Sequence, residues 1–511
     1  MKEFIMLYQE VISGIIYGVT GQLIRVEVEM RNGLPYFTMV GYLSKESTEA
    51  KERVASALRS VGHPLPAMKI TVNLSPANIR KNGTAFDFPI AVAFLACLGK
   101  IPSKELNRTC ILGELGLNGT IHGVGYCLPI VMEAKKQGIH RFFIAEEDSD
   151  SVEEMEDVEI IFMRRLSDIF HYFDGMMEKS GRKNKKWKKK PMEEDFLDMK
   201  GQQHLKRAIE IAITGRHHIL LVGSPGSGKT MAIKRVPSIL YPLTKQERME
   251  VQSIYDAAGI VRNLLDDRQP FRTPHTSISK AAFLGGGHLP KAGEITLAHH
   301  GILVLDELME YRPECLESLR QPLEERKISI YRAGHPMIFP SDFQMIAAMN
   351  PCPCGYALED GKCRCTYHQK KQYLKKLSGA ILDRFDMILT VVNEEEPSNL
   401  LEESSKMIRE RVIQNVEKEH QLLSGTDYHF FSEIRPADME NLCPLSKKCI
   451  EVLKMAYRMK KVTKRGIWKL KKLAMTIALM EGETKIQEHH LMEALSFRNT
   501  GFISEVSGDG R

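Results

Sequence analysis

The sequence predicts an α/β protein of several domains that contains a parallel sheet and ends in a helical region. First, 511 residues are too many for one ordinary core, so two or three domains are expected. Second, the apolar strand Ile219–Val222 comes after the helical stretch Ala208–Thr214 and directly before a glycine loop, which is typical of a strand–loop–helix unit. Third, helical periodicity dominates from Pro397 onward, which predicts a small helical lid over residues 397–511.

Composition narrows the class of protein. The chain is 43% hydrophobic and 27% charged, and no apolar stretch reaches the roughly 18 to 20 residues that cross a bilayer, so no membrane contact is expected. The N-terminus lacks a secretory pattern, which favours a cytoplasmic protein whose ten cysteines are mostly reduced. The net charge of +6 permits nucleic-acid binding without arguing for it.

Two regions precede the glycine loop. Short β-rich runs such as Arg25–Met30 and Lys69–Leu74 mix with helical stretches at Thr48–Val61 and Pro89–Leu98, which predicts a first α/β or α+β domain over residues 1–175. Residues 176–194 then form a basic linker, because the lysine-rich run Ser180–Pro191 repels itself and buries no apolar surface. This run is either a plain tether or a basic arm on phosphates, and Trp187 within it favours contact with a base.

The glycine loop is a phosphate-binding motif. Residues 223–230 read G-S-P-G-S-G-K-T, between the predicted strand and helix, and comprise Gly223, Ser224, Pro225, Gly226, Ser227, Gly228, Lys229 and Thr230. The glycines let backbone N–H groups face the phosphates, Lys229 reaches the β and γ phosphates, and the Thr230 hydroxyl ligates magnesium. ATP and Mg²⁺ are the expected ligands, and a chance glycine-rich turn is the alternative.

Three later strands end or begin at polar residues. Ile302–Leu305 runs into Asp306, which is placed to hold magnesium, and Glu307, which is placed to activate the attacking water. A pair of acids there could instead cap a helix. Phe343–Ala347 leads to Asn350, which would position the water beside the γ-phosphate unless it is a plain turn residue.

Arg384 precedes the last of these strands, Met387–Val392. Its permanently charged guanidinium suits a finger inserted into a neighbouring subunit's site. The alternative is an internal ion pair with Asp383 or Asp386. The nucleotide-binding core is expected to span residues 195–396.

Four cysteines lie in an insert over residues 351–368. Cys352, Cys354, Cys363 and Cys365 form two C-x-C pairs, and four thiolates brought together by a tight loop suit tetrahedral zinc. The commoner zinc spacing is C-x-x-C, so reduced thiols or a redox disulfide stay as alternatives.

A β-hairpin is expected over Lys327–Pro340, because apolar and polar residues alternate on both sides of Ala333 and Gly334. Such a hairpin could project into a central pore, where Arg332 and His335 would meet a phosphate backbone. A surface hairpin that only tethers inserts is the alternative.

The order of glycine loop, D-E strand, asparagine strand and arginine resembles AAA+ ATPases. The segments F-R-T-P-H-T-S-I-S from Phe271, G-G-G-H-L-P-K-A-G-E-I-T-L from Gly285, L-R-Q-P-L-E from Leu319 and N-P-C-P-C-G from Asn350 narrow the resemblance to the magnesium-chelatase-like YifB/ComM family. The segments V-N-L-S-P-A and G-T-A-F-D-F-P-I-A, between Ile70 and Ala91, extend it to the N-terminal domain.

This resemblance implies a Lon-protease-like, ribosomal S5-like N-terminal domain, an AAA+ core and a helical lid. It also implies a homo-hexameric ring that drives branch migration of DNA in recombination or natural transformation. By the same resemblance Asn350 is similar to a sensor 1 residue, Arg384 to an arginine finger and Arg465 to a sensor 2 residue. Because Met475 and Leu479 depart from the family pattern, Lys469 or Lys472 could serve instead of Arg465.

The Lon-like domain is expected to lack peptidase activity. A Lon-type site needs a serine nucleophile and a lysine. This sequence has Ala85 where the serine should lie, and His122 and Leu128 where the lysine should lie, while Thr84 lacks an evident base. The expected function is therefore ATP-driven DNA translocation, with a chelatase-like or protein-remodelling ATPase and a nucleotide-gated binding switch as rivals.

Overall fold

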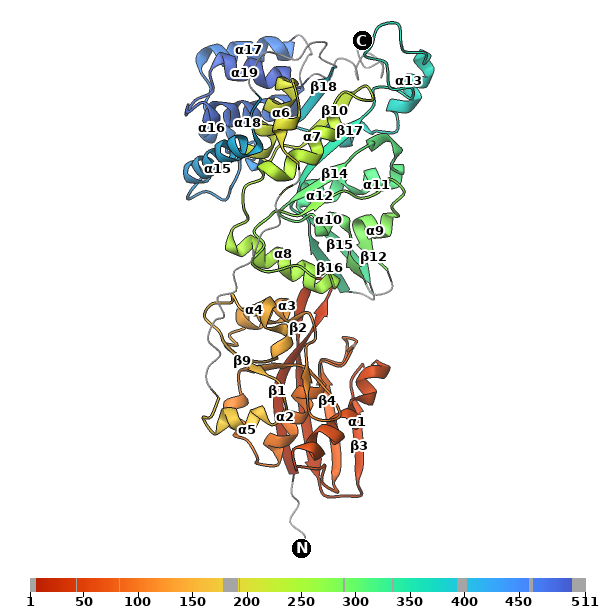
Figure 1. Ribbon diagram of the computed structural model, residues 1–511, viewed down its shortest axis with the longest axis vertical. Helices are drawn as coiled ribbons and strands as arrows, with labels where there is room; N and C mark the ends of the chain where they lie inside the picture. The colour runs from red at the N-terminus through yellow and green to blue at the C-terminus, as the bar shows by residue number, and fades with distance from the viewer. Residues whose placement is uncertain are drawn as a thin grey trace.

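A computed structural model of the chain describes residues 6–42, 44–81, 83–177, 192, 194–287, 290–332, 335–392, 402–458 and 463–498. The molecule is elongated, with an N-terminal unit at one end and a larger unit at the other (Figure 1). The lysine-rich run that the sequence analysis interprets as a linker lies outside the described residues.

A seven-stranded mixed sheet forms the N-terminal unit, in the order β3-β4-β2-β1-β5-β8-β9. Strands β1 and β2 are antiparallel, as are β2 and β4, whereas β5, β8 and β9 continue from β1 in parallel. The bounds are β1 Met6–Tyr17, β2 Thr20–Arg31, β3 Tyr36–Val40, β4 Lys69–Ser75, β5 Thr109–Leu112, β8 Arg141–Ala145 and β9 Glu159–Met163.

Helices cover both faces of this sheet. One face packs against α1 (Lys45–Ser60), α2 (Asp87–Cys97) and α5 (Asp168–Phe173). α2 is buried along its whole length because its residues are apolar except Asp87, which pairs with Arg53. The other face packs against α3 (Cys127–Lys136). This sandwich matches the mixed α/β domain expected at the N-terminus.

The second unit is built on a five-stranded sheet in the order β11-β14-β17-β10-β18, and every pair is parallel. Its strands are β11 Phe271–Arg272, β14 Ile302–Leu305, β17 Gln344–Met349, β10 Ile219–Gly223 and β18 Met387–Val391. β10, β14 and β17 are buried throughout, as expected for continuous apolar runs in a sheet covered on both faces. The predicted strands are therefore confirmed to within two residues.

The C-terminal helices share a hydrophobic core with one face of the five-stranded sheet. That core joins α6 (Gln203–Thr214) and α7 (Lys229–Arg235) to α15 (Ser405–Leu422), α18 (Lys464–Met480) and α19 (Glu488–Ser496). α16 (Met439–Leu442) and α17 (Lys447–Arg458) complete this helical region, which lies beside α6 in Figure 1. The helical interpretation of the C-terminal region is thus confirmed over the described residues.

The opposite face of the sheet carries α8 (Lys245–Ala258), α10 (Glu294–Leu297), α11 (Pro313–Ser318) and α12 (Arg320–Glu325). Helix α8 begins with a capping box between Thr244 and Glu247 and ends at Gly259, which has a positive φ of 71°. Toward the N-terminal unit it forms two ion pairs, Arg248–Glu154 at 3.2 Å and Lys245–Glu156 at 2.5 Å. The two units therefore meet through α8 and α3 (Figure 1).

The predicted hairpin is present as β15 (Lys327–Arg332) and β16 (His335–Pro340). Ile328 and Phe339 on its inner face are buried in the core beneath the sheet, and the Phe339 ring lies close to Gly18 at the β1–β2 turn. The side chains of Arg332 and His335, proposed as phosphate contacts, lie outside the described part of the structure.

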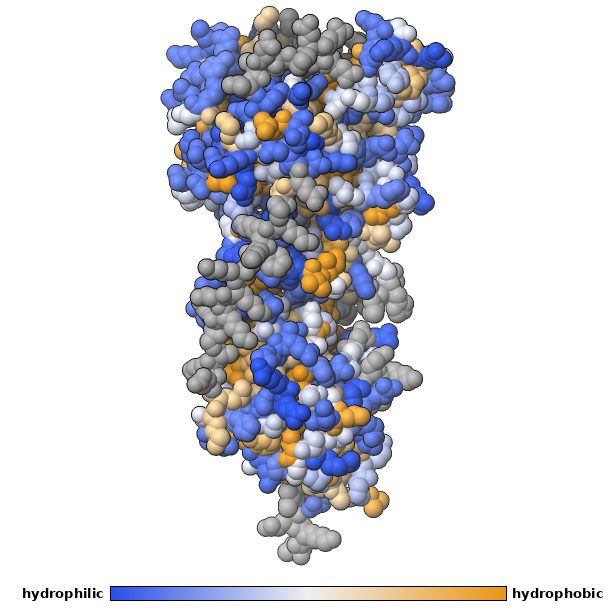
Figure 2. All heavy atoms as spheres, viewed as in Figure 1, coloured by the Kyte–Doolittle hydropathy of each residue, from blue (hydrophilic) through white to orange (hydrophobic). Residues whose placement is uncertain are grey.

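Hydrophobic side chains on the face shown in Figure 2 occur as small groups among hydrophilic ones. Among the described helices, none is both long and apolar enough to span a bilayer.

Candidate functional site

The glycine loop lies between the end of β10 and the start of α7. Gly228, at the N-cap of α7, has a φ of 88°, a backbone conformation that favours glycine. A Cβ at Gly223 would lie 2.5 Å from the Val391 carbonyl oxygen of β18, so a larger residue there would push the loop away from the sheet. Both glycines hold the loop tightly over the end of the sheet.

Lys229 is buried and points back into its own loop. Its ammonium donates hydrogen bonds to the carbonyl oxygens of Gly223 at 2.7 Å and Ser224 at 2.8 Å, and it lies 3.3 Å from Ser227 Oγ. Burial lowers the pKa of Lys229, against the attraction of Asp306. An anion bound in the loop would favour the charged ammonium, because it would compensate the charge that burial leaves unscreened.

The two acidic residues after β14 are arranged differently from each other. Asp306 accepts a hydrogen bond from Thr230 Oγ1 at 2.9 Å and another from the backbone N–H of Glu307 at 2.9 Å. The Glu307 side chain is exposed, and its backbone φ is 51°, in the left-handed region that non-glycine residues rarely adopt. Asp306 is thus fixed against the glycine loop, whereas the Glu307 carboxylate faces solvent.

Asn350 follows β17 and closes the same site. A cavity of about 350 Å³ is lined by residues 225–231 of the loop and helix α7, by Asp306 and Glu307, and by residues 348–350. The sheet order explains this, since β17 lies between β14 and β10 and all three strands end at one edge. The structure therefore brings together Lys229, Thr230, Asp306, Glu307 and Asn350.

The two predicted arginines do not line that cavity. Arg384 and Arg465 line a separate cavity of about 430 Å³ between the sheet and the C-terminal helices. Arg384 precedes β18, so it lies at the amino end of a parallel strand, opposite the glycine loop. Its ion-pair partner is Glu324, not Asp383 or Asp386 as the alternative interpretation proposed, and its Nε is buried without a hydrogen-bond partner among the described residues.

Lys469 and Lys472, the two alternatives to Arg465 on α18, already have hydrogen-bond partners inside the protein. Lys469 Nζ donates to the Phe385 carbonyl at 3.0 Å and pairs with Asp386 at 3.1 Å, and burial lowers its pKa. Lys472 Nζ donates to the Ser432 carbonyl at 2.8 Å. Arg465 is exposed at the start of the helix, so its guanidinium is the more accessible of the three.

The four cysteines converge in space. Their sulfur atoms all lie within 4.8 Å of one another, with Cys352–Cys354 at 3.3 Å and Cys363 at 3.8 Å from both. All ten cysteines of the chain are free thiols. Backbone N–H groups of Tyr356 and Arg364 lower the pKa of Cys354 to about 6. The cluster is a set of four soft ligands in a space that suits one metal ion.

In the N-terminal unit, Thr84 has a partner that the sequence did not reveal. Its hydroxyl donates to Glu114 Oε2 at 2.5 Å, so the expectation that it lacks a nearby base needs correction. Ala85 and Leu128 are buried, and His122 is exposed beside Glu147, with 3.2 Å between Nδ1 and Oε1.

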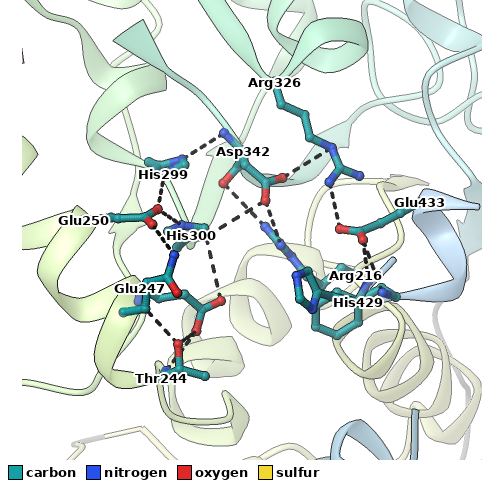
Figure 3. Close-up of polar contacts among 12 residues, drawn as sticks. Arg216, Thr244, Glu247, Glu250, His299, His300, Arg326, Asp342, His429 and Glu433 are labelled. Atoms are coloured by element: carbon teal, nitrogen blue, oxygen red, sulfur yellow. Dashed lines mark hydrogen bonds and ion pairs between the residues drawn. The ribbon is translucent and has the colours of Figure 1, made fainter. Parts of the chain in front are cut away.

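The structure also contains a charged network at the amino ends of the sheet strands, which the sequence does not predict (Figure 3). Asp342 pairs with Arg216 at 3.1 Å and with Arg326 at 3.7 Å, and Arg326 also pairs with Glu433 of the C-terminal region at 2.8 Å. Burial alone would raise the pKa of Asp342, but the charges of Arg216 and Arg326 hold it below its usual value. No short motif marks these residues, which lie far apart in sequence.

The network continues into helix α8. His300 Nε2 contacts Glu250 Oε2 at 2.8 Å, and His299 Nε2 lies 3.5 Å from the same oxygen. Hydrogen bonds from His299 and His300 hold the pKa of Glu250 well below its usual value. In the sequence, the adjacent histidines His299 and His300 before β14 are the one sign of this network, and two adjacent histidines do not form a recognised motif.

Three protein-family models match the chain. The model "Magnesium chelatase, subunit ChlI" matches residues 195–399, "Subunit ChlI of Mg-chelatase" matches residues 26–148, and "Magnesium chelatase, subunit ChlI C-terminal" matches residues 402–498. Together they cover both units and the C-terminal helices.

Curated proteins match along most of the chain. Competence protein ComM of Haemophilus influenzae is 36% identical over 499 residues, which cover 94% of this chain and 95% of the relative. YifB of Salmonella typhimurium is 35% identical over 489 residues, with the same coverage. Partial matches include Lon protease 2 of Bacillus subtilis, 26% identical over 31% of this chain and 33% of its own, and the probable DNA helicase MCM9 of Arabidopsis thaliana, 22% identical over 58% of this chain and 41% of its own.

Proposed function

The chain belongs to the magnesium-chelatase-like family of ComM and YifB, a family of AAA+-type ATPases, and from this premise we propose that it is an ATP-driven motor that moves DNA. The observation that carries the proposal is the hydrogen bond from Thr230 to Asp306 on the wall of the cavity that Lys229 and Asn350 also line. Strand ends of a parallel sheet are where such proteins bind nucleotides.

ATP binding would use the glycine loop. The ammonium of Lys229 would exchange its loop carbonyl partners for the β and γ phosphates of ATP. Magnesium prefers oxygen ligands, and the Thr230 hydroxyl and Asp306 carboxylate supply two oxygens that already lie 2.9 Å apart, so these residues fit the ion. When bound, the ion neutralises charge on the phosphates.

Hydrolysis would use Glu307 and Asn350, which both line the cavity. The exposed carboxylate of Glu307 is free to accept a proton from the attacking water, and Asn350 faces the same cavity from the neighbouring strand. Asp306 would orient this step, because it holds the backbone N–H of Glu307.

A ring would complete the site. Arg384 and Arg465 line one cavity at the amino end of the sheet, so neither is positioned to reach the phosphates of its own chain. Arg384 pairs with Glu324, and its buried Nε has no hydrogen-bond partner among the described residues. We propose that both arginines contact the nucleotide of the adjacent subunit in a homo-hexamer, with Arg384 as the finger and Arg465 as the second sensor.

DNA as the substrate is proposed from the relatives and from the hairpin. One relative is a competence protein and a partial match is a probable DNA helicase. The β15–β16 hairpin precedes β17, and the exposed Tyr331 near its tip could stack on a base. We propose that the tip, with Arg332 and His335, contacts the DNA backbone during branch migration in recombination or transformation.

The test is ATP hydrolysis and three-strand branch migration by the wild-type chain. Lys229→Ala should lose both activities, and Glu307→Gln should lower kcat by roughly 10² to 10⁴-fold while it still binds ATP. Glu310→Gln, a matched change of an exposed acid three residues later, should leave kcat unaltered. The DNA assignment fails if wild type hydrolyses ATP but moves no junction and DNA does not stimulate it.

The domain organisation is proposed as a Lon-like unit at 1–175, a basic linker at 176–194, an AAA+ core at 195–396 with an insert at 351–368, and a helical lid at 397–511. We propose that the Lon-like unit has no peptidase activity, even though Thr84 contacts a carboxylate. Cleavage of a fluorogenic peptide that survives Lys229→Ala but is lost in Thr84→Ala would contradict this.

The cysteine cluster is proposed to hold one Zn²⁺ ion. Zinc bound by sulfur at about 2.3 Å in a tetrahedron requires sulfur–sulfur distances of about 3.8 Å. Three of the six sulfur–sulfur separations are 3.3, 3.8 and 3.8 Å, and all six are within 4.8 Å. Elemental analysis should find about one zinc per chain.

A further inference from the structure

We infer that the cysteine-bound loop acts as a metal-dependent brace for the phosphate-binding loop, so that zinc occupancy sets the affinity of the chain for nucleotide. This rests on the proposed ATP and zinc sites. Zinc would lie outside the nucleotide cavity, since no cysteine lines that cavity. Its effect would pass through the short segment that the cysteines enclose.

In the first contact between the two loops, Gly355 packs against the ring of Pro225. Gly355 has a φ of +87°, and a Cβ at this position would lie 2.6 Å from Pro225 Cδ and 2.8 Å from Pro225 Cγ. Pro225 is the third residue of the glycine loop and lines the nucleotide cavity. The turn after Cys354 is therefore pressed against the phosphate-binding loop, at a distance that only glycine permits.

The second contact is polar. The Glu359 carboxylate accepts a hydrogen bond from Lys362 Nζ at 2.7 Å, and it lies near enough to the Ser224 side chain that Lys362 and Ser224 together hold the pKa of Glu359 below its usual value. Ser224 is buried next to Gly223, and its carbonyl oxygen accepts from Lys229. The insert thus reaches both the second and the third residue of the glycine loop.

The third link is covalent. Asn350 stands two residues before Cys352, so the first cysteine fixes the chain directly after a residue that lines the nucleotide cavity. Cys365 lies immediately before Thr366, and Cys363 lies two residues earlier; Thr366 caps α13 (Tyr367–Leu374) through a capping box with Gln369. A metal held by all four sulfurs would tie the Asn350 end of the insert to the start of this helix.

The insert has no hydrophobic core of its own that could hold its two ends together without a metal. Of the four cysteines only Cys352 is fully buried, the Lys362 side chain is 67% exposed, and Leu358 is only partly buried against the core beneath the sheet. A segment of this size that buries little apolar surface usually depends on a metal for its fold. Loss of the ion would release Gly355 and Glu359 from the glycine loop and leave Pro225 and Ser224 without their support.

The test measures zinc by elemental analysis, and the binding of a fluorescent ADP analogue, on the full-length chain. Wild type should hold about one zinc per chain and bind the analogue. Cys363→Ser with Cys365→Ser should lose zinc and bind about tenfold more weakly or worse, because the unfolded insert no longer braces the loop. Cys97→Ala in the N-terminal unit is the matched cysteine control and should change neither quantity.

Two further variants keep the metal and break the contact. Glu359→Gln should retain one zinc and bind the analogue about three- to tenfold more weakly, the usual effect of losing a charged hydrogen bond. Gly355→Ala should also retain zinc and weaken binding, through the clash with Pro225. Neither variant depends on the folding of a cysteine-free insert.

Normal ADP binding by a folded, zinc-free cysteine variant would overturn the inference, as would normal binding by both Glu359→Gln and Gly355→Ala. A zinc-free wild type that binds the analogue normally would refute it as well. Absence of nucleotide binding in wild type would instead refute the ATPase proposal, since the zinc content is measured independently.

Discussion

The two ends of the five-stranded sheet differ in how many partners their polar side chains have. At the carboxyl ends, Glu307 is exposed, and the hydrogen-bond partners of Lys229 among the described residues all belong to its own loop. At the amino ends, Asp342 pairs with two arginines, and one of these, Arg326, continues to Glu433 (Figure 3). The carboxyl ends of the strands keep charged groups available for a ligand, whereas at the amino ends ion pairs between charged side chains connect different parts of the fold.

This difference separates the end of the sheet that binds a ligand from the end that holds the fold together. A group that must bind a ligand cannot have all its donors and acceptors occupied inside the protein, whereas a buried charge that only supports the fold must be paired. The amino end also has an intermediate case, because Arg384 pairs with Glu324 but has a buried Nε without a partner among the described residues and lines a cavity. Arg384 is the residue proposed to act on a neighbouring subunit.

Arg384→Ala should give the largest loss of ATPase activity, and it tests the proposed role of this arginine at the amino end of the sheet. If the guanidinium acts on the adjacent nucleotide, kcat should fall by about 10³-fold or more, while the affinity of the chain for ATP stays unaltered. Arg435→Ala removes an exposed arginine from the wall of the same cavity and should leave kcat within about twofold of wild type, as for an ordinary surface change. Steady-state ATPase assays with nucleotide-binding measurements distinguish the two.

Mixing the variants tests whether Arg384 acts between subunits. Rings assembled from Arg384→Ala and Glu307→Gln chains should contain some sites with an intact glutamate and an intact arginine from different chains. Activity of the mixture above that of either variant alone is expected. A mixture as inactive as its components would assign Arg384 a role inside its own chain.

Asp342→Asn tests the ion-pair network at the amino end of the sheet and should lower the free energy of unfolding. The substitution leaves Arg216 and Arg326 without their common partner, and removal of one member of a buried ion pair costs about 3 kcal/mol of the free energy of unfolding. Asp157→Asn, in an exposed pair with Lys135, should cost less than about 0.5 kcal/mol. Denaturant unfolding measures both, and equal losses would show that the network does not contribute as a buried pair.

The sequence predicted the carboxyl end because that end depends on local spacing. Eight consecutive residues build the glycine loop, and Asp306, Glu307 and Asn350 each follow an apolar strand whose neighbours in a parallel sheet are predictable. The amino end joins Arg216, Asp342 and Glu433 over more than 200 residues, so only the tertiary fold brings them together. The contact between Gly355 and Pro225 was hidden for the same reason.

The stability gap between wild type and Asp342→Asn should depend on pH. The pKa of Asp342 is lower in the folded chain than in the unfolded chain, so below about pH 4 the unfolded state binds more protons and stability falls as pH falls. The stabilisation by Asp342 is complete above about pH 5 and is lost progressively in acid. Unfolding measured from pH 3 to pH 7 should show the gap narrowing at the acid end, and a constant gap would contradict the assignment.

Arg326 gives the smallest expected effect, because its side chain is 46% exposed and solvent screens part of its attraction for Glu433. A double-mutant cycle with Arg326→Ala and Glu433→Gln should give a coupling of about 1 kcal/mol. The exposed pair Arg320–Glu317, 2.5 Å apart within one segment, should give less than about 0.5 kcal/mol and lose even that at high salt. If both pairs couple equally, Arg326 does not hold the C-terminal helices to the sheet, and the amino end of the sheet connects fewer elements than its contacts suggest.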